Sequence, residues 1–238
     1  MAKGVRELLD RAASEVGLAL QDPVSAEIAQ FLDMFMEHRD LLGLMAPVGW
    51  RELVYQHVMD ALLGTSVLNP MPGERVIDVG SGGGFPGVPL AVANPGVRVT
   101  LLEVSRKKAG FLRRACAAFC GRVEVECGRA EDAGRAGLRG AFDCCVSRAA
   151  GPMPAVLEWC LPLVRVGGRV GLWKGPDPYG EVKASARALE VLGGRLHTVQ
   201  LYELPGGYGC RSVVMVQKEA VTPEMYPRRA GVPEKRPL

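Results

Sequence analysis

The chain has 238 residues, enough for one substantial domain or for one domain with a small helical addition. Its hydrophobic fraction of 48% and charged fraction of 23% are ordinary for soluble globular proteins and argue against a disordered chain or a membrane protein. A formal net charge of +3 is too small to indicate nucleic-acid binding by itself.

The first 20 residues carry spaced charges and no continuous apolar core. We therefore expect neither a signal peptide nor a membrane span, and a cytoplasmic location. Three dispersed histidines and the absence of any C-x-x-C pair predict no metal site. The seven cysteines are expected to be reduced thiols in the core: Cys116, Cys120, Cys127, Cys144, Cys145, Cys160 and Cys210.

Apolar residues recur at helical spacing in about residues 5–20, 24–42 and 50–64, which predicts an N-terminal helical extension over residues 1–70. From 71 to 222 the pattern changes to short apolar runs that alternate with helical stretches. This alternation predicts an α/β fold with a mainly parallel sheet and helices on both faces. The expected strands are 75–80, 98–104, 123–128, 142–148, 167–175, 195–204 and 211–218. Residues 223–238, rich in proline and basic side chains, are predicted to form an extended arm.

A glycine-rich turn follows the first expected strand, in the stretch VIDVGSGGGFPGVPL. Ligands of doubly wound sheets bind at this point, beyond the carboxyl end of the strand. Glycine lets the backbone adopt positive φ and lets a ligand pack against main-chain atoms. The alternative is a plain tight turn. The glycines that would face a ligand are Gly80, Gly82 and Gly84.

The same letters also fit the dinucleotide fingerprint G-x-G-x-x-G, through Gly82, Gly84 and Gly87. Asp78 favours S-adenosylmethionine, because a carboxylate suits its cationic ammonium and sulfonium groups better than a pyrophosphate. Glu103, at the end of the second expected strand, can accept hydrogen bonds from ribose hydroxyls of either ligand.

The third expected strand brings Ala130 and Glu131 to the same edge of the sheet. Glu131 could accept from the adenine amino group or from a neighbouring backbone, or be an exposed loop acid. Three acids at successive strand ends are more specific than any one of them. Together they favour S-adenosylmethionine.

Several blocks resemble the RsmG (GidB) family of bacterial small-subunit ribosomal RNA methyltransferases. These blocks are DVGSGGGFPGVPLAV, LLEVSRKKAGFLRRA, GRAED, FDCCVSRA, CLPLVRVGGRVGLWKG and YPRRAGVPEKRP. The resemblance implies a class I, Rossmann-like methyltransferase fold and methylation of a guanine N7 in 16S ribosomal RNA by S-adenosyl-L-methionine. By motif, Gly80, Phe85, the Ala130-Glu131 pair and Arg148 would contact the cofactor.

This chain departs from the family pattern at four places, one of which is the segment LGLMAP, where family members commonly show N-L-T. It has Glu103 where the family often has aspartate, and Arg211-Ser212 where the family has R-H. Of the N-terminal R-H-x-x-D-S motif only His57 and Asp60 remain. His57 could line the cleft, although its apolar helical neighbours are more typical of a core histidine.

Guanine N7 attacks with an in-plane lone pair, so the reaction needs no general base and we assign no catalytic residue. Cys144 and Cys145 lie in an apolar strand, which favours unreactive thiols over a cytosine C5 nucleophile. Arg148 could meet cofactor or RNA phosphate, or form a surface salt bridge. The predicted RNA contacts are Arg148, Lys174, Arg211, Arg228 and Arg229.

Two alternatives remain at this stage. One is an NAD-dependent oxidoreductase, and the other is a non-catalytic RNA-binding or ribosome assembly protein. In the favoured interpretation the partner is small-subunit ribosomal RNA or a ribosomal particle, and the enzyme is a monomer.

Overall fold

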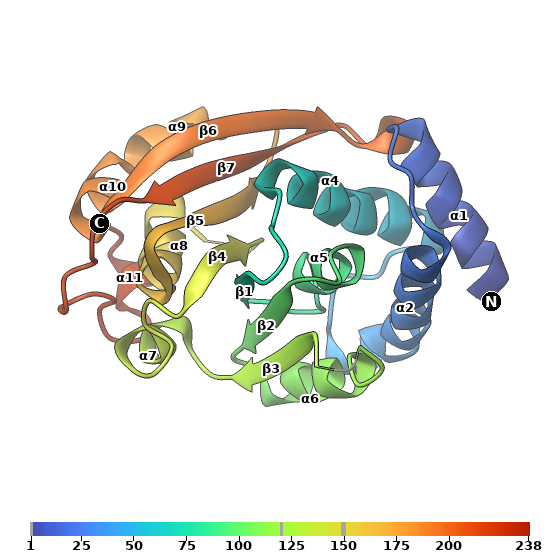
Figure 1. The fold of residues 1–238 in the computed structure, drawn as a ribbon, viewed down its shortest axis with the longest axis horizontal. Coiled ribbons are helices and arrows are strands. Elements are labelled where there is room, and N and C mark those ends of the chain that lie inside the picture. The colour runs from blue at the N-terminus through green and yellow to red at the C-terminus, as the bar shows by residue number, and fades with distance from the viewer. Residues whose placement is uncertain (1, 120, 149–150) are drawn as a thin grey trace.

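The computed structural model describes residues 2–119, 121–148 and 151–238 (Figure 1). Within them, seven strands form one sheet of order β3-β2-β1-β4-β5-β7-β6. All neighbouring pairs from β3 to β5 are parallel, and β7 is antiparallel to both β5 and β6. The mainly parallel sheet is thus confirmed. The strands are β1 Arg75–Val79, β2 Arg98–Glu103, β3 Val123–Cys127, β4 Phe142–Ser147, β5 Val164–Lys174, β6 Gly194–Glu203 and β7 Cys210–Lys218.

Helices cover both faces of the sheet, as expected. Successive side chains of a strand point to opposite faces, so Val76 packs on one side of β1 and Ile77 on the other. The Val76 face is covered by the N-terminal helices α1 Ala2–Glu15, α2 Asp22–Leu42, α3 Trp50–Glu52, the π-helical turn η1 Leu53–Val58 and α4 Met59–Leu68, and by α5 Gly87–Ala93 and α6 Arg106–Ala115. On the Ile77 side lie α7 Ala130–Arg135, α8 Met153–Cys160, the turn η2 Leu161–Leu163, α9 Tyr179–Ala184 and α10 Ala186–Leu192. In the described part of the chain no helix is both long and apolar enough to cross a membrane.

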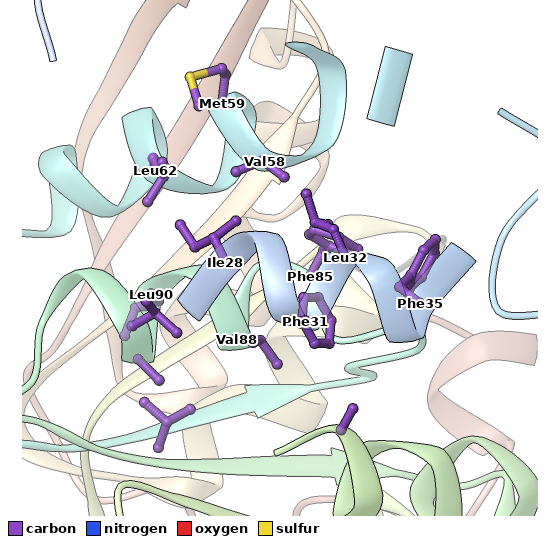
Figure 2. Close-up of a cluster of buried hydrophobic side chains, with 14 of the residues drawn as sticks. Ile28, Phe31, Leu32, Phe35, Val58, Met59, Leu62, Phe85, Val88 and Leu90 are labelled. Atoms are coloured by element: carbon purple, nitrogen blue, oxygen red, sulfur yellow. The ribbon is translucent and has the colours of Figure 1, made fainter. Parts of the chain in front are cut away.

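The aromatic face of α2 lies directly over the glycine-rich turn (Figure 2). The Phe85 ring centroid is 5.7 Å from that of Phe31 and 5.5 Å from that of Phe35. Phe111 of α6 joins them, 6.3 Å from Phe35. Such pairs contribute about 0.5–1.5 kcal/mol each beyond the area they bury. The N-terminal helices therefore share one continuous core with the sheet.

The end of the chain is not an extended arm, and that prediction is wrong. Residues 223–238, the C-terminal segment, pack on the body and end in α11 Val232–Lys235, which contacts α8. Arg139 donates hydrogen bonds to the carbonyls of Thr222, Pro223 and Tyr226, at 2.5, 3.2 and 2.8 Å. Buried apolar contacts and paired backbone carbonyls outweigh the polar composition of the segment.

The cysteines are only partly a core feature. Cys116, Cys144, Cys145 and Cys160 are buried, and the described cysteines form no disulfide. Cys127 is exposed, because β3 is an edge strand with one side toward solvent. The expectation of a core thiol is wrong for Cys127, and Cys120 lies outside the described residues.

Candidate cofactor site

The glycine-rich turn follows β1 at the carboxyl edge of the sheet. Gly80, Gly82 and Gly84 all have positive φ, at 75°, 55° and 102°. A Cβ added to Gly82 would have only Gly80 O within 4 Å, at 3.9 Å, so this glycine borders open space. One added to Gly87 would lie 2.6 Å from Asp78 Oδ2. Packing inside the protein therefore requires Gly87, whereas Gly82 leaves room for a ligand.

Asp78 lies beneath this turn and is completely buried. Its Oδ2 accepts a hydrogen bond from the Gly87 N–H at 3.0 Å. Oδ1 is buried and has no hydrogen-bond partner among the described residues. Burial raises the pKa of Asp78 to about 7. An unpartnered carboxylate oxygen of this kind is complementary to a cation, as the ammonium of S-adenosylmethionine requires.

Glu103 connects the end of β2 to the same turn. Its carboxylate is 6% exposed and accepts from the Gly82 N–H at 2.8 Å and the Ser105 N–H at 2.7 Å. Each carboxylate oxygen accepts through more than one lone pair, so capacity for ribose hydroxyls remains. The ribose contact stays a prediction. The structure shows in addition that Glu103 holds the glycine-rich turn in place through these two hydrogen bonds.

A cavity of about 140 Å³ opens beside Gly80, between the ends of β1, β2 and β3. Ala130 and Glu131 line it, so the residues predicted for the adenine end do come together with the glycine turn. Glu131 Oε1 accepts a hydrogen bond from the Gly231 N–H at 2.9 Å. The other lining residues are Val79, Leu102, Val104, Gly128, Arg129, Trp159 and Glu234.

A second, more open pocket of about 350 Å³ lies around Arg148, Lys174 and Arg211. Arg148 donates to Asp60 Oδ2 at 3.1 Å, and its guanidinium carbon lies 5.4 Å from the Phe85 ring centroid. Lys174 Nζ is 2.7 Å from Glu181 Oε2. Three of the predicted RNA-contacting cations therefore share one pocket wall with acidic side chains. The pocket also includes Gly151, Trp173 and Gly175.

A family model described as "GidB: rRNA small subunit methyltransferase G" matches residues 25–207. The chain belongs to this family. It is 41% identical to the ribosomal RNA small subunit methyltransferase G of Symbiobacterium thermophilum, over 100% of this chain and 99% of that protein. The protein of the same name from Moorella thermoacetica is 40% identical over 97% of both chains.

Solved structures share the fold of this rRNA small subunit methyltransferase G family member. The cofactor-bound Rv0187 from MTB superposes with a TM-score of 0.55 at 21% identity, over 85% of this chain and 100% of that one. TYW2 from M. jannaschii in complex with AdoMet gives a TM-score of 0.52 at 15% identity, over 67% and 74%. The class I methyltransferase fold is confirmed.

Two residues predicted from the family motif to contact the cofactor, Phe85 and Arg148, already interact with other side chains of the protein. The Phe85 ring packs in the aromatic cluster and is 4% exposed, so its visible task is to hold the turn against α2. Arg148 is held by Asp60 rather than by an exposed surface acid. Both stay predicted cofactor contacts.

The predicted RNA contact Arg228 does not belong to this basic pocket. Its Nη2 donates to Glu158 Oε2 at 2.6 Å, and its backbone N–H donates to Glu158 Oε1 at 2.7 Å. Glu158 is fully buried, so the guanidinium neutralises an internal charge. The structure does not support Arg228 as a phosphate ligand. Arg229, by contrast, is exposed.

His57 lies beside the second pocket, with its ring 6.2 Å from that of Phe85. Burial, together with the charges of Arg148 and Arg211, lowers its pKa to about 4. The imidazole is neutral at cellular pH.

Sequence reasoning missed the partners of Asp60 and the lining side chain Trp159. Tyr202 Oη donates to Asp60 Oδ1 at 2.8 Å, across 142 residues of sequence. Trp159 Nε1 is buried with no hydrogen-bond partner among the described residues. An acid such as Asp60 inside an otherwise apolar helix signals a buried polar contact, but the sequence does not name its partner.

Proposed function

We propose that this protein transfers the methyl group of S-adenosyl-L-methionine to small-subunit ribosomal RNA, at N7 of a guanine in 16S RNA. The buried Asp78 Oδ1, which has no partner among the described residues, carries the proposal together with the open Gly82 of the turn that follows it, in a chain that belongs to the rRNA small subunit methyltransferase G family. We also propose that the enzyme is cytoplasmic and acts as a monomer.

When bound, the cofactor supplies an electrophilic methyl group on a sulfonium. In this proposal the ammonium end faces Asp78, the ribose faces Glu103, and the adenine enters the cavity beside Glu131. Correct placement of the acceptor nitrogen against the methyl carbon can lower the barrier by up to about 7–11 kcal/mol. The carboxylates also complement the positive charge that moves from sulfur to the base.

The proposed acceptor needs no proton removed, and the neutral His57 is consistent with that chemistry. Burial raises the pKa of Cys144 to about 12 and that of Cys145 well above its ordinary value. Neither thiol supplies the thiolate that a cytosine C5 enzyme requires. The two strand cysteines therefore argue against cytosine C5 methylation.

Arg148, Lys174 and Arg211 would meet the RNA at the mouth of the second pocket. Their clustering supports an entry route for a splayed base, because such enzymes must bring the target atom to the methyl group. Arg229 would add a phosphate contact from the exposed end of the chain.

The dinucleotide alternative has a structural argument against it. A pyrophosphate would use the free N–H groups at the start of α5, but the Gly87 N–H already binds the carboxylate of Asp78. Placing a second anion against a buried carboxylate is unfavourable.

The deciding experiment incubates the protein with methyl-labelled cofactor and either purified small-subunit RNA or intact small subunits. We expect label in 16S RNA at a 7-methylguanine, located by the strand cleavage that this base permits after reduction. Cofactor binding without transfer to either substrate would instead favour the non-catalytic assembly protein. Thermal stabilisation by NAD but not by S-adenosylmethionine would favour the oxidoreductase.

A further inference from the structure

The C-terminal segment is fixed beside the small cavity by acids of the body. Glu158 accepts from the backbone and side chain of Arg228, and Glu131 accepts from the backbone of Gly231. Arg135 Nε donates to Pro227 O at 2.7 Å. Gly231 has φ 78° and directly precedes α11. The left-handed conformation lets the chain turn into this last helix.

The turn into α11 brings Glu234 to the rim of the cavity of about 140 Å³. The walls of this cavity include the apolar side chains of Leu102, Val104 and Ala130. Its polar side chains are Arg129, Glu131, Glu234 and Trp159, and the buried Nε1–H of Trp159 lacks a partner in the described structure.

The two carboxylates and the indole N–H are complementary to the edges of adenine. The exocyclic amino group donates hydrogen bonds, which carboxylates accept, and the ring nitrogens accept, which an indole N–H satisfies. Hypoxanthine has a carbonyl in place of the amino group, so it would place an acceptor against carboxylates. The two carboxylates therefore favour a 6-aminopurine over a 6-oxopurine.

We infer that the C-terminal segment forms a wall of the adenine cavity, in which Glu234 positions the adenine of the cofactor. This inference rests on the proposed function. Glu131 couples the two parts, because Oε1 holds Gly231 and Oε2 remains for the ligand. Docking of the segment and binding of the cofactor therefore strengthen each other. Residues 231–238 serve the cofactor rather than the RNA.

The test measures cofactor affinity by calorimetry with S-adenosylhomocysteine, in the full chain, in Glu234→Ala and in a chain that ends at Ala230. The control is Glu224→Ala, which removes the same charge from an exposed position of the same segment that lines none of the described cavities. We expect Kd to rise about ten-fold in Glu234→Ala and at least about ten-fold in the truncated chain. The control should stay within about two-fold.

Two further measurements are independent of how well the truncated chain folds. Saturating S-adenosylhomocysteine should slow tryptic cleavage after Arg229 and Lys235 in the full chain. Glu234→Gln should reduce the preference for S-adenosylhomocysteine over its inosine analogue, because an amide also donates to the carbonyl of hypoxanthine.

Unchanged Kd in Glu234→Ala, with unchanged proteolysis in the presence of ligand, would overturn this inference. The proposed function would still stand if the full chain bound the cofactor and methylated RNA. A full chain that bound no cofactor would overturn the proposed function itself.

Discussion

Arg148 donates a hydrogen bond to Asp60 across 3.1 Å, and this bond connects the end of β4 to α4. The Asp60 side chain is 7% exposed and that of Arg148 is 20% exposed. Because water reaches both groups only in part, each charge is stabilised largely by the other. Tyr202 occupies the second oxygen of Asp60. The network fixes one wall of the pocket proposed to receive the RNA base.

Asp60→Ala should therefore lower the free energy of unfolding by about 2–3 kcal/mol, because it leaves Arg148 and the Tyr202 hydroxyl without their partner. Asp60→Asn should cost less, since an amide oxygen still accepts from one of them. Urea unfolding of both variants measures the difference. A cost below about 0.5 kcal/mol for Asp60→Ala would show that solvent replaces the contact.

The ionisation of Asp78 should make stability depend on pH in the cofactor-free protein. Its folded pKa, about 7, lies above the ordinary value of 3.8, so the folded state binds the proton more tightly. The contribution of this group is fully present below the ordinary value and is lost as pH rises through about 7. Asp78→Asn removes that loss. Its stability relative to the parent should increase by about 2–3 kcal/mol between about pH 5 and pH 7.5.

Thermal and urea unfolding at the two pH values measure this change, and a pH-independent difference would contradict a raised pKa. Asp78→Asn should also weaken cofactor binding above about pH 7, where the parent side chain is ionised. In the parent protein the affinity for the cofactor should rise with pH up to about 7, because only the ionised carboxylate attracts the ammonium.

Arg228 and Arg229 are adjacent arginines with different expected roles. Arg228→Ala leaves the buried Glu158 without its cation and should destabilise the protein by about 3 kcal/mol. Arg229→Ala should change stability by less than about 0.5 kcal/mol. It should weaken RNA binding. The slope of log K for RNA binding against log salt concentration should also become shallower by about one.

Chemical denaturation and RNA binding at several salt concentrations separate the two roles. The assignment would be contradicted if Arg228→Ala kept full stability and if this variant, but not Arg229→Ala, changed the salt dependence of RNA binding. Arg228 would then contact RNA in solution rather than pair with Glu158.

Gly82 and Gly17 offer a matched pair for testing the open side of the glycine turn. Both have left-handed φ, at 55° and 71°, and an added Cβ meets no close contact at either. Alanine at either position should therefore cost about 1 kcal/mol of stability through backbone strain. Only Gly82→Ala should also weaken cofactor binding, by at least about ten-fold, as measured by calorimetry. Equal cofactor affinity in the two variants would show that the cofactor does not pack against Gly82.

Much of the fold and half of the site could be predicted from sequence. Every expected strand is present within a few residues, because each is a short apolar run between turn or helix signals. The glycine turn, Asp78 and Glu103 could also be predicted from sequence, because they follow adjacent parallel strands and such strands end at the same edge of a sheet.

The C-terminal segment was predicted wrongly because its partners are remote in sequence. Glu158 lies 70 residues before Arg228 in an otherwise apolar helix, and Glu131 lies 100 residues before Gly231. Composition shows that residues 223–238 are polar and proline-rich, but not that buried acids neutralise them. The lining of the small cavity by Trp159 and Glu234 could not be predicted for the same reason.

The packing of α2 on Phe85 and Phe111 has a consequence for how the chain is made. Translation adds α2 to the chain before either phenylalanine, so its aromatic face initially has nothing to cover it. The first helices of this protein can complete their folding only after nearly half of the 238 residues have been synthesised.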